Sequence, residues 1–377
     1  MKNKIKLFDG HIHTCFRVPL RESVYIYDRE FELLNINKFC FLAAPIYTRM
    51  CGGDVNLLDN LKALYYKATF APDAYAFAGL EHDYSMPVNE RADFYLKQIK
   101  EYMEAGFDGL KMLEGYPPYY KKLGVKFIDD CYAPLWDYLE QNSVPVLMHL
   151  AHPKIFWDIN KIPQTWIDHG NYYDDTFPSF YDFLDDIFSV LDRHPNLRLT
   201  LAHTGFMGED IDLAQKFLSY PYTCFDITPG GEQILEICNG KNRDWWIDFI
   251  KKNPTRFKHG TDLYQFEYTN EKDWQKSIST RTELVVNFLS SNKQFNYVGT
   301  DYKGIKLPKK LQKLILHDNL LKELGLPKPI DFNWCKNQIE RFKPLFPNRE
   351  TLDGYDLWCM EHDFESLKKD GYLTFFG

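Results

Sequence analysis

Phe8-Asp9-Gly10-His11-Ile12-His13-Thr14 is the stretch on which the interpretation of this chain depends. The run Ile5-Lys6-Leu7-Phe8 leads into it and predicts a short strand. In an extended chain, residues i and i+2 point to the same face, so both imidazoles can reach one point just past the strand. Neutral imidazole is a good ligand for zinc and similar ions. An isolated His-x-His also fits two polar surface residues. The rest of the sequence has to decide between a metal site and a polar surface.

The composition narrows the class of protein. The chain has 377 residues, 45% of them hydrophobic, which is enough for one large domain or two ordinary ones with a substantial core. A net charge of −8 disfavours a nucleic-acid binder, which would normally carry a basic stripe. The eight cysteines are scattered and contain no C-x-x-C, so we expect reduced thiols. Because the sequence has neither a signal-peptide segment nor an apolar run of membrane-spanning length, we expect a cytoplasmic protein without a membrane partner.

Apolar runs alternate with helical patterns along most of the chain. After the first strand, further strands are predicted at residues 39–43, 75–80, 107–113, 144–148, 197–202, 222–227 and 256–260. The clearest helix is residues 179–193, where Ser179 and Asp182 form a capping signature. Such alternation indicates parallel strands, and eight units predict an α/β fold, a (β/α)₈ TIM barrel with long βα loops. The alternative is a doubly wound open sheet. That fold should have a first turn rich in glycine, whereas the first turn here is His-x-His.

The barrel is expected over residues 1–327, with a C-terminal extension over residues 328–377 packed on it. Residues 153–177 are long for a strand-to-helix connection. Loops of this length are usually functional or carry small elements of their own.

Polar side chains stand at the ends of many of these predicted strands. They are His11, His13, Lys111, Glu114, His149, His203 and Asp262. In a barrel the carboxyl ends of all strands face one mouth, so residues far apart in sequence converge there. Their joint placement predicts a metal site at that mouth.

In these segments the sequence resembles the amidohydrolase superfamily, in particular its amidohydrolase-related (amidohydrolase 2) branch of metal-dependent TIM-barrel hydrolases and decarboxylases. The resemblance covers about residues 5–325, and the segment that follows has no counterpart. The matching segments are Asp9–His13, Gly109–Leu113, Pro145–His149, Arg193–Gly205, Gly260–Asp262 and Leu314–Asn319.

The resemblance implies a role for each site residue. His11, His13 and His149 would bind a divalent ion, for which Zn is the first choice. Asp262 would be the carboxylate ligand, and His203 would orient or polarise water or substrate. Such an ion lowers the pKa of bound water toward 7 and polarises a substrate oxygen. Asp262 would then accept a proton from that water and pass it to the leaving group.

Lys111 leaves the number of ions open. In relatives with two metals a lysine at this place is carboxylated and bridges them, whereas in relatives with one metal it has another part near the substrate; we favour one ion. Arg17 and Arg49 lie in loops after the first two strands and could bind a substrate carboxylate or form ordinary salt bridges. His152, three residues after His149, could line the site, but we favour a loop histidine.

The function expected from this resemblance is that of a metal-dependent hydrolase acting on a small-molecule ester, lactone or amide, bearing a carboxylate, through a metal-activated water. The alternative is a non-oxidative decarboxylase, because the same metal cradle can stabilise the charge left when CO₂ departs. A further alternative is a barrel that binds a small molecule without catalysis, against which the intact ligand set argues. A homodimer is compatible with the resemblance.

Overall fold

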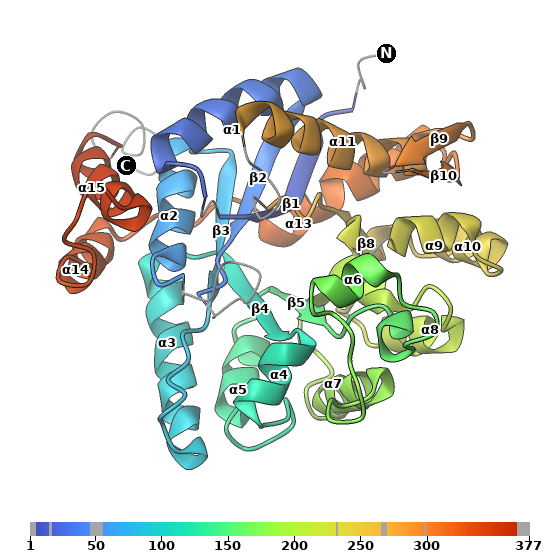
Figure 1. Ribbon diagram of the computed structural model, residues 1–377, viewed down its shortest axis with the longest axis horizontal. Coiled ribbons are helices and arrows are strands. Elements are labelled where there is room, and N and C mark those ends of the chain that lie inside the picture. Colours follow the sequence, from blue (N-terminus) through green and yellow to red (C-terminus); the bar gives the residue numbers. More distant parts are fainter. Residues whose placement is uncertain are drawn as a thin grey trace.

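Each strand of the main sheet pairs in parallel with the next strand along the chain. The computed structural model describes residues 5–14, 17–45, 56–230, 233–264, 270–297 and 299–367. The strands are β1 (Leu7–His13), β2 (Ile36–Leu42), β3 (Ala74–Gly79), β4 (Gly109–Gly115), β5 (Val146–Leu150), β6 (Leu199–Leu201), β7 (Cys224–Ile227) and β8 (Phe257–His259). This order, with helices between the strands, confirms the (β/α)₈ TIM barrel (Figure 1).

The barrel closes just beyond the short strand β8. Leu263 forms a parallel bridge with Ile12 of β1. The backbone N–H of His13 donates to the carbonyl oxygen of Leu263 at 2.8 Å. In turn, the N–H of Leu263 donates to the carbonyl oxygen of His11 at 3.2 Å. The hydrogen bonds that close the barrel therefore involve the backbone of His11 and His13.

Helices surround the barrel (Figure 1). They are α1 (Leu20–Leu34), α2 (Asp59–Thr69), α3 (Arg91–Ala105), α4 (Pro117–Leu123), α5 (Ala133–Gln141), α6 (Gln164–Asp168), α7 (Phe180–Arg193), α8 (Ile211–Ser219), α9 (Gln233–Asn239), α10 (Arg243–Lys252), α11 (Glu271–Ser290), α12 (Lys309–Lys313), α13 (Asn319–Leu324), α14 (Phe332–Phe342) and α15 (Leu352–Leu367), with an antiparallel pair β9 (Gln294–Tyr297) and β10 (Thr300–Lys303). Among these helices none has an apolar stretch long enough to span a bilayer.

Several predicted boundaries were wrong. Strand β1 continues through His13, which pairs with Leu42 of β2, so the two histidines lie inside the strand and not past its end. Helix α11 begins at Glu271, where the side chain of Asn270 accepts a hydrogen bond from the backbone N–H of Asp273 and caps the helix. The capping box predicted for α7 is confirmed.

Apolar side chains fill part of the barrel interior. This buried cluster consists of Phe8, Cys40, Leu42, Tyr75, Phe77, Leu147, Ala202 and Leu320. Leu320 belongs to α13, and a Cβ on Gly10 would lie 2.7 Å from its Cδ1. The absence of a side chain at Gly10 therefore leaves room for Leu320 of α13 in the barrel interior.

The C-terminal extension contacts the barrel through α15. Asp356 is fully buried, and its carboxylate accepts a hydrogen bond from the backbone N–H of Leu20 at 2.8 Å. It also lies 2.8 Å from the buried ammonium of Lys62 on α2. Figure 1 shows α14 and α15 beside α2. The domain boundary at residue 327 stays a prediction.

Replacing Asp356 by alanine should destabilise the protein, because it removes the nearer partner of a buried ammonium. We expect a loss of about 3 kcal/mol in the free energy of unfolding, at the lower end for a broken buried pair because Asp353 lies 3.5 Å from Lys62. Urea denaturation followed by circular dichroism measures it. The double variant Lys62→Met/Asp356→Leu should be more stable than either single variant. An unchanged midpoint in Asp356→Ala would contradict this account.

Candidate metal centre

Two side chains of β1 and one from the segment after β8 meet at the carboxyl end of the barrel. Nε2 of His11 lies 3.3 Å from Nε2 of His13 and 3.2 Å from Oδ1 of Asp262. The distance from His13 Nε2 to the same oxygen is 3.4 Å. The ligand atoms of these residues all lie within 4.8 Å of one another, so together they could hold a metal ion.

A carboxylate on β7 fixes the orientation of the His11 ring. Nδ1 of His11 lies 2.6 Å from Oδ2 of Asp226, and both side chains are buried. A carboxylate accepts hydrogen bonds, so Nδ1 carries the proton and the lone pair of Nε2 faces His13 and Asp262. Burial is the main cause that holds the pKa of His11 well below its usual value, and the ring is neutral. Acceptor atoms that converge in this way fit a cation between them.

His149, near the end of β5, faces the same cavity but stands apart from this tight group. Its Nε2 is buried and has no hydrogen-bond partner among the described residues. The centre of its ring lies 5.2 Å from that of His203. A buried ring nitrogen without a partner is unfavourable unless a ligand occupies its lone pair, so His149 also fits the predicted ion.

His203 follows β6 and is fixed by residues of the β7 segment. Its backbone N–H donates to Oδ1 of Asp226 at 2.6 Å, and its Nδ1 lies 2.5 Å from the hydroxyl of Thr228. A Cβ on Gly230 would lie 2.1 Å from the same Nδ1, so only glycine leaves room for the ring. Burial lowers the pKa of His203 to about 4. The turn at Gly230 thus has a packing role beside the site.

Backbone strain gathers around these side chains. From His203 to Phe206, four consecutive residues have φ values of 55°, 52°, 60° and 53°, in the left-handed region. Asp262 has a φ of 52°. Such conformations cost energy for residues other than glycine, and in folded proteins they cluster at functional sites. Here they aim the side chains of His203 and Asp262 into the barrel mouth.

Lys111 reaches the centre from β4, whereas Glu114 does not. Nζ of Lys111 lies 3.2 Å from Nε2 of His11, and burial lowers the pKa of Lys111 to about 8. The carboxylate of Glu114, three residues later, is 2.8 Å from Nε2 of His82. The pairing of β4 with β5 is irregular between Met112 and Gly115. Glu114 is directed to His82 and does not line the cavity, so placing it with the site residues was wrong.

Of the two predicted arginines, only Arg17 lies in the described residues, and it is not brought to the centre. Arg17 is exposed and is not among the residues that line the cavity. Arg49 lies outside the described residues.

A cavity of about 170 Å³ opens beside the ligand group, and aromatic side chains form much of its wall. Its lining holds His13, His149, His203 and Asp262 at one side, and the aromatic residues are Tyr116, Tyr119, Phe156, Trp166, Phe206 and Tyr264. No lysine or arginine is present in this lining within the described ranges.

Sequence reasoning missed several residues here. Asp226 stands within the buried strand Cys224–Ile227, and a carboxylate in an apolar run was the available signal. His152, interpreted as a loop histidine, lines the cavity, with its ring centre 5.1 Å from that of His149. Asn171 also lines it, from the long connection after β5, and no periodic pattern pointed to this residue.

The sequence model of a family described as Amidohydrolase matches residues 86–219. This stretch contains Lys111, His149 and His203, and it confirms the resemblance drawn from the motifs. No curated protein matches the chain.

Solved structures show the same fold. An uncharacterized TIM-barrel protein from Bordetella bronchiseptica is 14% identical, with a TM-score of 0.51, over 85% of this chain and 100% of the other. A 5-carboxyvanillate decarboxylase from Sphingomonas paucimobilis is 10% identical (TM-score 0.46; 86% and 100% of the two chains). A 2,6-dihydroxybenzoate decarboxylase from Rhizobium is 15% identical (TM-score 0.47; 85% and 98%). At these identities the similarity concerns the fold alone.

Asp226→Asn should weaken metal binding by about 10- to 100-fold, the usual effect of losing a partner that orients a ligand. Both oxygens of Asp226 accept hydrogen bonds, one from His11 and one from His203 and Thr228. An amide would turn an N–H group toward one of these donors. Competition with a chromogenic chelator measures the affinity.

Thr228→Val is the matched control, since it removes the hydroxyl contacts with His203 and with Oδ1 of Asp226 but keeps the carboxylate whose Oδ2 holds His11. Its metal affinity should stay within about threefold of the wild type, well inside the effect expected at Asp226. Equal losses in both variants would contradict the role given to Asp226.

Proposed function

We propose that this chain, whose residues 86–219 match the amidohydrolase family, is a metal-dependent enzyme that removes CO₂ from a small aromatic carboxylic acid. The observation that carries the proposal is the cavity itself. Ring nitrogens and a carboxylate converge at one side of it, and the rest of the wall is largely aromatic and carries no lysine or arginine among the described residues. This combination suits a flat, apolar substrate with one anionic end.

The ligands in this proposal are His11, His13, His149 and Asp262. Three imidazoles and a carboxylate match the preferences of Zn²⁺, which is the ion we propose; a single ion is favoured because only one group of ligand atoms gathers among the described residues. Lys111 is then an uncarboxylated lysine beside His11. When bound, the ion would supply a Lewis acid that stabilises negative charge on the substrate.

The size and polarity of the cavity favour an aromatic acid. A cavity of about 150 Å³ can hold benzene, and this one measures about 170 Å³. Because the described wall offers no cationic side chain, the substrate carboxylate has to lie at the ligand group. The apolar part of the wall would also leave the substrate less hydrated than it is in water, which assists the loss of CO₂ because charge is more dispersed in the transition state than in the carboxylate.

In this reaction the bond between the ring and the carboxylate carbon breaks, and its electron pair stays on the ring carbon. That carbon takes a proton as CO₂ leaves. The pKa of Asp262 lies well below its usual value, because burial is outweighed by the neighbouring histidines, so the group is ionised. Asp262 is therefore proposed to relay to that carbon a proton that it takes from solvent, since its carboxylate faces the cavity at the ligand group. His203, held by Asp226 and Thr228, is proposed to orient the substrate.

The hydrolase expected from the sequence becomes the second candidate. The same ligand group could activate water, as expected for an ester, lactone or amide substrate. We place it second because a largely apolar wall suits the loss of CO₂ better than attack by water. Product analysis separates the two reactions.

The zinc-loaded protein should release CO₂ from at least one hydroxylated benzoic acid, without incorporation of ¹⁸O from labelled water into the aromatic product. Asp262→Asn should lower kcat by at least about 10³-fold, because it loses both the ligand charge and the proton carrier. Coupled CO₂ detection and mass spectrometry provide the measurements. Hydrolysis of aryl esters or lactones with ¹⁸O incorporation, and no CO₂ release, would overturn the decarboxylase in favour of the hydrolase.

His149→Ala should lower the zinc content from about one ion per chain to well below half, and should remove the rise in melting temperature on zinc addition. Elemental analysis and thermal unfolding test this. His362→Ala is the matched control, because His362 is exposed on α15 and only bonds the carbonyl of Trp358. Stoichiometric zinc in His149→Ala would remove His149 from the ligand set, and a wild-type protein without zinc affinity would support a non-catalytic binding protein.

A further inference from the structure

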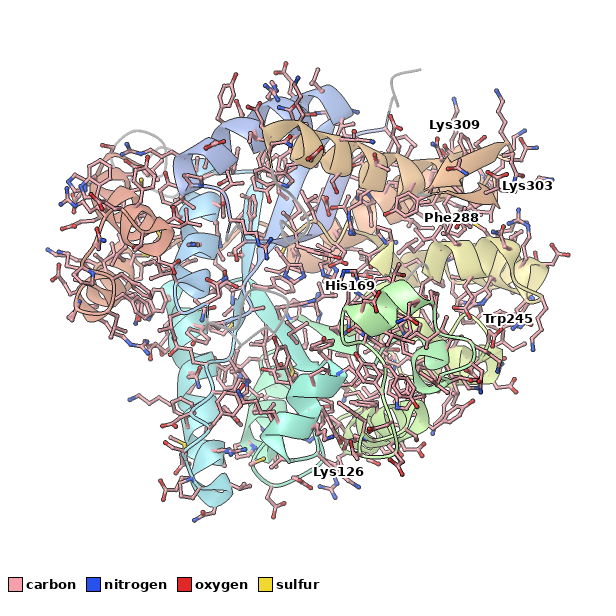
Figure 2. All side chains as sticks on the ribbon, viewed as in Figure 1. Lys126, His169, Trp245, Phe288, Lys303 and Lys309 are labelled. Atoms are coloured by element: carbon pink, nitrogen blue, oxygen red, sulfur yellow. The ribbon has the colours of Figure 1, made fainter. Side chains whose placement is uncertain are left out.

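The connection between β5 and α7 covers the cavity and supplies part of its wall. It carries the short helix α6 and two residues of the lining, Trp166 and Asn171. The backbone N–H of Asn171 donates to the carbonyl oxygen of Trp166 at 2.9 Å. The backbone N–H of Tyr173 donates to the carbonyl oxygen of Phe156, also at 2.9 Å. Figure 1 shows α6 at the front of the molecule beside β5, and Figure 2 shows His169 just past its end. The connection is therefore an ordered part of the site.

Asn171 is fully buried, and two hydroxyl groups determine how its amide is oriented. Its Oδ1 accepts from the hydroxyl of Tyr116 at 3.2 Å and lies 3.4 Å from that of Tyr173. Its Nδ2 is buried and has no hydrogen-bond partner among the described residues. An amide nitrogen carries two N–H donors, and buried donors are rarely left unpaired in folded proteins. Since Asn171 lines the cavity, a ligand there can supply the missing acceptor.

A series of contacts through Tyr173 and His152 connects this amide to the metal centre. The hydroxyl of Tyr173 lies 2.7 Å from Nδ1 of His152. The ring centre of His152 is 5.1 Å from that of His149 and 5.0 Å from that of Tyr116. Asn171 is thus reached from His149 through His152 and Tyr173, and belongs to the same cavity without joining the ligand group.

We propose that the amide of Asn171 is a second binding subsite, which donates a hydrogen bond to an uncharged oxygen on the ring of the substrate. This inference rests on the proposed function and names its substrate class more closely: an aromatic acid that bears a hydroxyl, ether or keto oxygen away from the carboxylate. The oxygen is uncharged because the flanking wall is made of Phe156 and Trp166 and has no described cationic side chain. A second carboxylate there would be buried without a partner, which is costly.

The test compares ring acids of equal shape that differ by one oxygen. The probes are 3- and 4-methoxybenzoate and their isosteres 3- and 4-ethylbenzoate, titrated into the zinc-loaded protein by calorimetry. At one ring position the wild type should bind the methoxy acid about tenfold more tightly than the ethyl acid, the effect of one satisfied hydrogen bond. In Asn171→Leu the ratio of the two Kd values should fall to within about twofold, whereas in the exposed control Asn142→Leu it should stay at the wild-type value.

Asn171→Asp serves as a second variant should Asn171→Leu fail to fold. It keeps an acceptor for the hydroxyls of Tyr116 and Tyr173, and replaces the N–H donors, so it should also abolish the preference for methoxy acids.

The outcomes separate this subsite from the proposed function. Zinc-dependent binding of all four acids without a methoxy preference would overturn the subsite and leave the aromatic-acid enzyme standing. A preference that persists in the Asn171 variants would likewise overturn the subsite. If none of the four acids binds the zinc-loaded protein, the proposed function falls, and this subsite falls with it.

Discussion

The pairing of Leu263 with Ile12 is the interaction on which the rest of the structure depends. It closes the barrel, and it sets the backbone just after Asp262 against the strand that carries His11 and His13. The carboxylate of Asp9 adds two hydrogen bonds from Thr261, one from its N–H at 3.0 Å and one from its hydroxyl at 2.6 Å. The residues before and after Asp262 are therefore both held by β1. Closing the barrel and assembling the ligand group are one structural event, which is why residues so distant in sequence converge.

Asp226 links the two halves of the centre. One of its oxygens holds the ring of His11, and the other accepts the backbone N–H of His203 and the hydroxyl of Thr228. Its hydrogen bond to the backbone of His203 helps to offset the energetic cost of the left-handed turn that begins there. A single buried carboxylate thus sets both the tautomer of a proposed ligand and the position of a proposed substrate-binding histidine. Such residues behind the ligands determine how precisely a metal site is formed.

The fold was predictable from the sequence because its signals are local. Each strand is an apolar run, and the spacing of His11 and His13 puts both side chains on one face of β1. The direction of Glu114 was less predictable, because the pairing of β4 with β5 is irregular between Met112 and Gly115 and the side chain contacts His82. Asn171 could not be found this way, because its position depends on hydroxyl groups of Tyr116 and Tyr173 in a connection without periodic pattern. Arg17 was predicted from its place after a strand, but being in a loop near the mouth does not fix the direction of a side chain.

The cavity has two ends that differ in origin as well as in polarity. The end that gathers nitrogen and carboxylate ligands is built on strands, where hydrogen-bonded neighbours fix each side chain and small displacements are resisted. The other end is neutral and is built from the connection after β5, with Phe156, Trp166 and Asn171. With the proposed ion bound, an aromatic acid would have one favourable direction of entry, because the reversed direction would place its carboxylate among uncharged groups and away from the ion. The polarity difference therefore orients the substrate before any contact specific to its ring. The neutral end lies on a connection outside the barrel strands. Side chains of that connection can therefore change while the strands keep the ligand group in place. In this fold, reaction type and substrate choice can thus vary independently.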